Sequence, residues 1–271
     1  MREVRSQKSE VRKKRLLLLS GVILGILSTV ILSGDASAKL TATANHDHIS
    51  IDFFYHGSTV SVRGVSDPGM DLIIKITSPE EPQQLLKKGK VAGLLWMNVG
   101  KLEFEKLPKL YALHSTGKIE DILSRDEMDR YGLGYPALEK RAEITPVAGG
   151  DEKAAWFDHF VKLKESSKLY SMSSGKINLT QDNGKQNYYV LLEWPYQARP
   201  DHYTITVYAV KGMKVVETAE THVSVEQVGV VKSLAGMAKN NGALYGVISI
   251  LAALAAGFGV GMVFGKGGGA H

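Results

Sequence analysis

Four side chains of the kinds that bind metals lie close together near residue 50. The stretch NHDHISIDFFYHG places His46, Asp47, His48 and His56 within eleven residues. If His46 and His48 lie in one strand, their side chains point to the same face, with Cα atoms roughly 6.5–7 Å apart. Two imidazoles at that spacing can chelate Zn or Cu, while Asp47 points away. His56 would follow at the far end of the strand, where it cannot close the site.

A protein zinc site uses three or four protein ligands, and this stretch supplies only two. The other interpretation is that these are exposed polar residues near the start of a mature domain, where chains commonly fray. The sequence favours exposed polar residues. Metal binding by His46 and His48 remains the second hypothesis.

Other catalytic chemistry has little support in the sequence. The chain has no cysteine, which excludes disulfides, thiolate ligands and thiol nucleophiles. His114 next to Ser115, and Asp201 next to His202, supply the residue types of a Ser-His-Asp triad. However, the G-x-S-x-G turn that presents a nucleophilic serine is absent. We therefore predict no catalytic residues, no cofactor site and no enzymatic activity.

The N-terminus has the pattern of a secretory signal. Residues 2–15 hold seven Lys or Arg against two Glu, and the apolar run Leu16 to Leu32 ends shortly before Ala36-Ser37-Ala38. This pattern predicts a signal peptide over residues 1–38 and a mature start near Lys39. The apolar run is 17 residues long, whereas signals usually have about 7–15. An uncleaved N-terminal anchor is therefore the alternative.

A second apolar segment, Ala243 to Phe264, contains 22 residues and no charge. A helix needs about 20 apolar residues to span a bilayer, so this segment predicts a transmembrane helix. The signal would then place residues 39–226 in the periplasm of a bacterium. Residues 227–242 would form a juxtamembrane linker, and residues 265–271 a cytoplasmic tail. The prediction is a single-pass protein of the inner membrane.

The charge balance excludes nucleic acid as a partner. The whole chain has 33 basic and 28 acidic residues, but Lys39 to Gly242 has 25 of each. The excess of positive charge therefore belongs mainly to the export signal. A neutral domain lacks the basic surface with which proteins bind phosphate backbones.

The predicted membrane helix carries a stripe of small residues. They recur every fourth position and include two overlapping G-x-x-x-G steps: Ser249, Ala253, Gly257, Gly261 and Gly265. In lipid, such a stripe lets a second helix approach closely enough for van der Waals packing. Gly and Ala are also common in membrane helices in general. We favour a helix partner, which is either a second copy or a different membrane protein.

The segment between the two apolar runs alternates at period two near both ends, and its middle, about residues 116–167, has helical periodicity. Three strands between His48 and Pro79 predict a meander. Asn183-Gly184 predicts a type I′ hairpin turn. Tyr203, at the start of HYTITVYAV, fits the tyrosine corner of immunoglobulin and fibronectin type III sandwiches. The predicted fold is therefore a mainly β sandwich of that kind with a helical insertion, followed by one membrane helix.

Taken together, these segments resemble a family of transmembrane proteins first described in alphaproteobacteria, with chains of about this length. The resemblance rests on ISIDFFYHGSTVSVRG, on GLLWMN with Trp96, on LPKLYALHS with Pro108 and Tyr111, and on HYTITVYAV with Tyr203. It implies a topology and no activity. We expect structural roles for Trp96, Pro108, Tyr111 and Tyr203. We expect a non-enzymatic accessory protein that binds or helps assemble a membrane complex or transporter. A periplasmic metal-binding module using His46 and His48 is the alternative.

Overall fold

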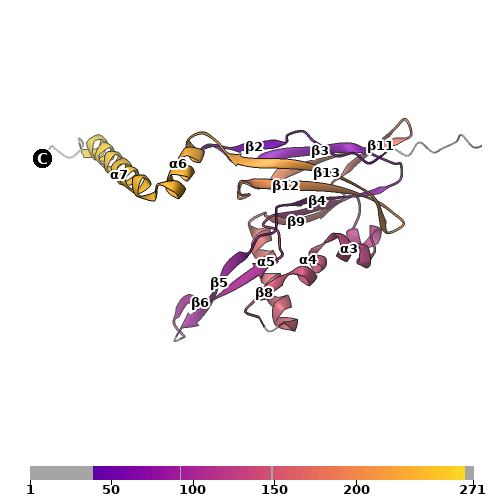
Figure 1. Cartoon of the computed structure of the whole chain (residues 1–271), viewed down its shortest axis with the longest axis horizontal. Coiled ribbons are helices and arrows are strands. Elements are labelled where there is room, and N and C mark those ends of the chain that lie inside the picture. Colours follow the sequence, from indigo (N-terminus) through magenta and orange to yellow (C-terminus); the bar gives the residue numbers. More distant parts are fainter. Residues whose placement is uncertain (1–38, 92, 148, 266–271) are drawn as a thin grey trace, which may run out of the picture. The chain divides into compact units, whose positions relative to one another are not determined.

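The structure is a computed structural model that describes residues 39–91, 93–147 and 149–265. The predicted signal peptide and the tail after Gly265 lie outside the described residues. Residues 39–227 form a β-rich domain, which two C-terminal helices follow (Figure 1).

Two sheets pack face to face to form a sandwich (Figure 1). The first sheet has the order β1-β3-β11-β10, with bounds β1 (Thr43–Ala44), β3 (Ser58–Ser66), β11 (Lys185–Trp194) and β10 (Asn178–Asp182). The second sheet has the order β2-β13-β12-β4-β7-β9, with bounds β2 (His48–Ile51), β13 (Lys214–Gln227), β12 (Asp201–Lys211), β4 (Asp71–Thr77), β7 (Tyr111–Ser115) and β9 (Tyr170–Ser174). Alternate side chains of both sheets fill the first hydrophobic core between them.

The predicted three-stranded meander is wrong. β2 and β3 follow each other in the chain but lie in different sheets, since β2 pairs in parallel with β13 and β3 pairs with β11. Between them the chain turns at Asp52, whose Oδ1 accepts a hydrogen bond from the Phe54 N–H at 2.9 Å. A hairpin and a crossing between two sheets both produce alternating burial, so the sequence pattern does not separate them.

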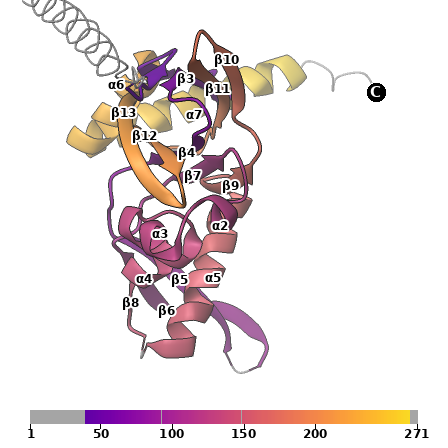
Figure 2. The ribbon, with the colours of Figure 1, turned by 90° about the vertical axis from the view of Figure 1, so that its right-hand side faces the viewer.

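A layer of helices covers the other face of the second sheet (Figure 2). It contains α2 (Ile119–Ile122), α3 (Arg125–Tyr131), α4 (Tyr135–Arg141) and α5 (Gly150–Ser166). The central strands β4 and β12 of the second sheet are therefore buried on both faces, and each has a nearly continuous buried run. The helical middle of the chain, predicted over about residues 116–167, is confirmed, since α2 to α5 all lie within it.

The sequence pattern predicts a helix over residues 151–167 with Trp156, Phe160 and Leu163 on one face, and helix α5 buries a different face. The buried side chains are Phe157, Phe160 and Val161, whereas Leu163 is 50% exposed. Trp156 is only half-buried, and the Lys87 Nζ lies 4.9 Å from the centroid of its ring. The predicted face is thus rotated by about one residue, because the helix packs against the sheet on one side and meets a hairpin on the other.

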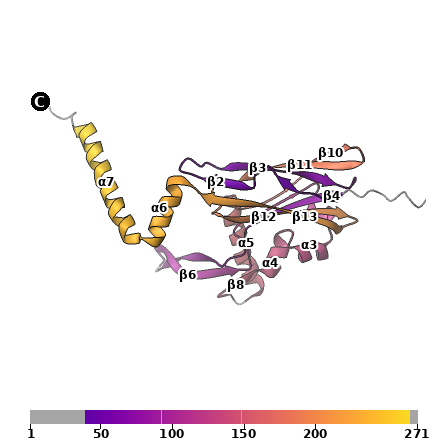
Figure 3. The same ribbon diagram turned by 45° about the horizontal axis from the view of Figure 1, so that its top comes forward.

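That hairpin is formed by β5 (Gln83–Val91) and β6 (Leu95–Glu105), with β8 (Glu143–Thr145) as a third strand at its base. The base contributes Leu102 and Phe104 to the second hydrophobic core, between the helices and the second sheet. The other end of the hairpin projects beyond the helical layer (Figure 3).

Two local predictions match the structure. Asp182 pairs with Lys185, and Asn183 and Gly184 between them have φ values of 49° and 74°, as a type I′ turn requires. Tyr203 donates its hydroxyl to the carbonyl oxygen of Arg199 at 2.7 Å, which is the hydrogen bond of a tyrosine corner.

After β13 the chain forms α6 (Gly229–Asn240) and α7 (Gly242–Gly265). The segment predicted as a linker therefore contains a 12-residue helix. Lys232, Ser233 and Lys239 share one side of α6, and its aliphatic residues share the other. Helix α7 includes a window, Gly242–Met262, that is long and apolar enough to cross a membrane, in agreement with the predicted span.

Candidate functional site

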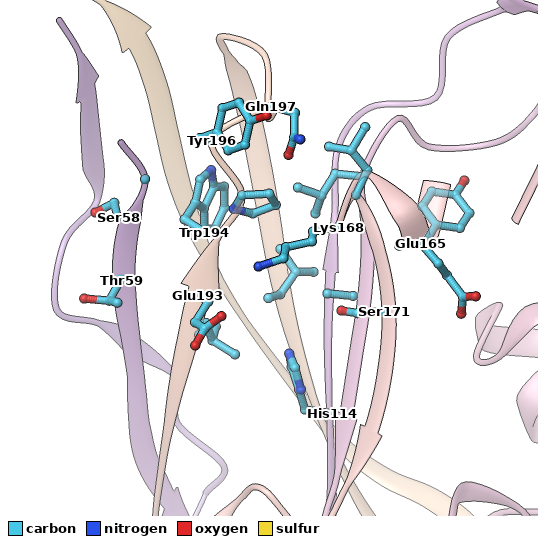
Figure 4. A pocket seen from close by; sticks show the side chains of 18 of the residues that line it. Ser58, Thr59, His114, Glu165, Lys168, Ser171, Glu193, Trp194, Tyr196 and Gln197 are labelled. Atoms are coloured by element: carbon cyan, nitrogen blue, oxygen red, sulfur yellow. The ribbon is translucent and has the colours of Figure 1, made fainter. Parts of the chain in front are cut away.

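A groove of about 810 Å³ opens between the edges of the two sheets. Figure 4 shows it between β11 and β3 on one side and the strands that carry His114 and Ser171 on the other. Its apolar lining comes from both sheets and includes Ile76, Leu110, Ala112 and Leu192. The volume lies within the range of about 300–1,000 Å³ that is typical of ligand sites.

The groove exists because the chain passes from the second sheet to the first between β9 and β10. β9 is the edge strand of the second sheet, and after residues 175–177 the chain continues as β10 in the first sheet. β10 pairs with β11 only as far as Tyr189. Beyond that residue, β11 is paired with β3 on one side, and no described strand lies on its other side.

The register shows which backbone groups lie on this open edge. The carbonyl oxygens of Val65 and Ser61 in β3 point toward the N-terminal segment. They accept hydrogen bonds from the N–H groups of Thr41 and Asn45. The alternate residues of β3 therefore face β11, where Val60 pairs with Leu192. It follows that the N–H and C=O groups of Leu191 and Glu193 point away from β3, to the open edge.

One end of the groove holds two unpaired polar atoms. The Trp194 Nε1, a donor, and the Gln197 Oε1, an acceptor, are buried and have no hydrogen-bond partner among the described residues. Both residues lie at the same end of the groove (Figure 4). Trp194 is 4% exposed, and its ring meets Tyr203 edge-on at 4.9 Å, which fixes the position of the indole. Such atoms favour a ligand that both accepts and donates hydrogen bonds.

Charged side chains surround the mouth of the groove. Lys168 follows the end of α5 in a left-handed conformation, φ 57°, and its side chain extends into the groove (Figure 4). Lys176, Glu165 and Glu193 also line the groove. Glu165 accepts a hydrogen bond from the Tyr135 hydroxyl at 2.8 Å. With two cations and two anions, the groove has no strong preference for an ionic ligand.

His114 lies at the floor of the groove, with its Nδ1 2.6 Å from the Ser173 Oγ. Burial, assisted by the positive charge of Lys176, lowers the pKa of His114 to about 4. A histidine with so low a pKa is a weak base, and the charged group acting on it is a cation rather than the carboxylate that a triad needs. This pair therefore does not resemble an activated serine nucleophile.

The lowered pKa of His114 predicts a pH-dependent stability. The unfolded chain binds a proton near the ordinary pKa of 6.5, and the folded state does so only near 4. The contribution of neutral His114 is therefore complete above pH 6.5 and is lost as the pH falls toward 4. Allowing for partial exposure of the ring, we expect the wild type to lose about 2 kcal/mol more than His114→Gln across this window. Urea unfolding of both proteins at several pH values measures this, and parallel pH profiles would contradict it.

The structure does not place His46 and His48 on one strand. β1 ends at Ala44 and β2 begins at His48, so His46 lies in the bend between two sheets rather than beside His48 on one strand. Both histidines are exposed. Within the part of the chain that the structure describes, no group of three or more His, Cys, Asp or Glu side chains could hold a metal ion.

The residues expected to be structural fall into two groups. Tyr111 is buried, donates to the Gly132 carbonyl oxygen at 3.1 Å and accepts from the Gly134 N–H at 2.7 Å. Pro108 is buried, and its carbonyl oxygen accepts from Tyr170 at 2.6 Å. Trp96, in contrast, is 67% exposed on β6. A structural role for Trp96 is therefore wrong, because the end of the hairpin that carries it packs on no other element.

The small-residue stripe lies on the exposed surface of α7. At Gly257 and Gly261, an added Cβ would meet no atom within 4 Å. Ser249 and Ala253 are exposed as well, and the Ser249 hydroxyl donates back to the Tyr245 carbonyl oxygen at 2.8 Å. Gly265 is the last residue of the helix. The stripe is thus available to another helix in the membrane.

The sequence did not point to the groove. Its polar residues, among them His114, Lys168, Trp194 and Gln197, come from separate elements and form no motif along the chain. The only local signal is that Pro195 ends the run that Trp194 closes, which marks the end of β11.

Comparison with known proteins places the chain in a family. No curated protein sequence matches the chain. The family model described as Putative transmembrane protein (Alph_Pro_TM) matches residues 39–266 of the 271-residue chain. The match covers the β-rich domain, the groove and α7. The chain therefore belongs to this family of transmembrane proteins, as its sequence resemblance predicts.

Proposed function

We propose that this protein is a non-enzymatic, single-pass accessory protein that binds an extended polypeptide segment of a membrane complex or transporter. In this proposal α7 spans the bacterial inner membrane, the β-rich domain lies in the periplasm and the C-terminus lies in the cytoplasm. The observation that carries the proposal is the open edge of β11 beside the groove. An exposed edge strand is a template for another strand, and many proteins bind peptides by adding them to such an edge.

The groove supplies what a bound strand needs. The N–H and C=O groups of Leu191 and Glu193 are oriented to form backbone hydrogen bonds with it. The Trp194 Nε1 and the Gln197 Oε1 provide one donor and one acceptor at the end of the groove. Each peptide unit carries both an acceptor and a donor, so a polypeptide satisfies both atoms. The apolar lining then accepts alternate side chains.

The stripe of small residues on α7 gives the proposal a second contact, within the membrane. A helix of the partner can approach Gly257 and Gly261 closely, because they carry no side chain and nothing covers them. Two weak contacts on one chain bind together more tightly than either does alone. Nucleic acid has no place in this proposal, since the domain is neutral overall.

Glu193→Pro tests the proposal directly. Proline removes the N–H that Glu193 presents to the open edge, and it leaves the pairing of β11 with β3 intact. The matched control is Glu193→Ala, which removes the same side chain and keeps the N–H. Both changes are made in the full-length protein with a photo-crosslinking amino acid at Leu191, and adducts are analysed in native membranes by mass spectrometry.

We expect a crosslink to one extended segment of a partner, retained in Glu193→Ala and lost in Glu193→Pro. Equal adducts in the two variants would show that the backbone edge is not the binding element. The absence of any adduct at Leu191 in native membranes would also count against the proposal.

A further inference from the structure

The outer end of the β5–β6 hairpin carries a cluster of exposed apolar side chains. We call residues 86–91 and 93–99 the hairpin tip. Its large apolar side chains are between 44% and 85% exposed: Leu86, Val91, Leu94, Leu95, Trp96, Met97 and Val99. Soluble surfaces rarely keep so many large apolar residues together, and such patches mark interaction sites.

Beyond Lys87, whose Nζ lies 4.9 Å from the centroid of the Trp156 ring, neither face of the hairpin tip is covered. Successive side chains of a strand point to opposite faces, and the consecutive residues Leu95, Trp96 and Met97 are all exposed. Farther along the same strand, Leu102 and Phe104 are buried under the helices. β5 contains nine residues, which corresponds to a length of roughly 30 Å at about 3.3 Å per residue. The tip therefore projects from the domain as an uncovered two-stranded ribbon (Figure 3).

The charge of the hairpin selects the class of partner. Four lysines flank the apolar residues, and the sequence between Gln83 and Lys101 contains no acidic residue: Lys87, Lys88, Lys90 and Lys101. Two copies of such a tip repel each other, so a second copy of this chain fits poorly. An anionic bilayer surface fits both properties, since its negative charge attracts the lysines and the apolar side chains enter the interface.

Trp96 has the character of an interfacial anchor. Its ring lies beside the Lys90 Nζ, at 5.6 Å from the centroid. Trp is enriched where membranes meet water, because the ring is apolar and its N–H seeks a polar partner. This explains a tryptophan that is 67% exposed in the structure.

We propose that the hairpin tip inserts into the headgroup region of the anionic bilayer in which α7 is anchored. The anchor keeps the tip at a high effective concentration near lipid, so weak insertion is sufficient. The protein then contacts the membrane at two separate places, which restricts the orientations of the domain. This inference concerns lipid and goes beyond the polypeptide contact proposed above.

The chain has no cysteine, so a single Leu95→Cys substitution carries an environment-sensitive fluorophore at the tip. The full-length labelled protein is reconstituted into vesicles of phosphatidylethanolamine and phosphatidylglycerol that contain a spin-labelled quencher lipid. We expect blue-shifted emission and quenching at position 95. Label at Asp182→Cys, in the exposed β10–β11 hairpin, is the control and should show neither. The Leu95→Cys protein should unfold at the wild-type midpoint, because Leu95 packs on no core.

Several results would overturn the proposal. A water-like emission without quenching at position 95 places the tip in solvent. A blue shift without lipid quenching places it against protein, and a shift that grows with protein density in the vesicle identifies a second copy. Combining Leu95→Cys with Lys87→Glu, Lys88→Glu and Lys90→Glu should abolish the shift, and so should vesicles of phosphatidylcholine alone. Retention of the shift in both would refute the role of charge.

Discussion

Replacing Phe160 with alanine is expected to lower the free energy of unfolding by about 4 kcal/mol, since large aromatic-to-alanine changes in a core typically cost about 3–5 kcal/mol. The side chain is fully buried in the second hydrophobic core. Its ring stacks on Phe104 with centroids 4.6 Å apart and meets Tyr170 edge-on at 5.7 Å. One side chain thus joins α5, the base of the hairpin and the second sheet.

Urea unfolding of the full-length protein in detergent, followed by tryptophan fluorescence, measures this loss. Leu163→Ala is the matched control on the same helix, because Leu163 is half exposed and should cost less than about 1 kcal/mol. Similar costs for the two variants would show that α5 does not pack as described. The segment after α5 also lines the groove, through Lys168 and Leu169. Phe160→Ala should therefore also weaken the crosslink at Leu191.

Gly64→Ala is expected to cost about 3 kcal/mol, at the upper end for overpacked sites. Gly64 lies in β3, and an added Cβ would come within 1.8 Å of the Thr41 carbonyl oxygen and 2.6 Å of the Tyr188 hydroxyl. These two groups are hydrogen-bonded to each other at 2.6 Å. The clash involves backbone, so a rotamer change of one side chain does not relieve it. The N-terminal segment, with buried Leu40, must move away.

The same unfolding measurement tests this prediction, with Gly100→Ala as the control. Gly100 also lies in a strand, and an added Cβ there would meet nothing within 4 Å. Near-zero change at Gly100 and a large loss at Gly64 are expected. A Gly64→Ala protein as stable as the wild type would mean that the segment at Thr41 does not cover Gly64.

Some local features of the fold could be predicted from the sequence. Asn183-Gly184 predicted its turn because few residues adopt two successive left-handed conformations. Tyr203 predicted its corner because the tyrosine lies at the start of an alternating strand, as in immunoglobulin-like sandwiches. The position of α5 was predicted to within a few residues, but its buried face was not, since periodicity alone does not show which of two neighbouring faces meets the sheet.

The pairing partners of the strands could not be predicted from the sequence. The sequence suggested that His46 and His48 share a strand, and the structure separates them into a bend and the start of β2. Trp96 was expected to have a structural role, but its side chain is 67% exposed. Its exposure depends on where the supporting helices end, which is a property of distant residues.

The sequence by itself determined the membrane helix, the mainly β composition with helices in its middle, the absence of cysteine chemistry and the family. These follow from composition and from periodicities that neighbouring residues impose on each other. Only the tertiary structure decided the open edge of β11, the unpaired atoms of Trp194 and Gln197, and the uncovered hairpin tip. Each of these depends on which strand pairs with which, and that choice is made by packing between segments far apart in the chain.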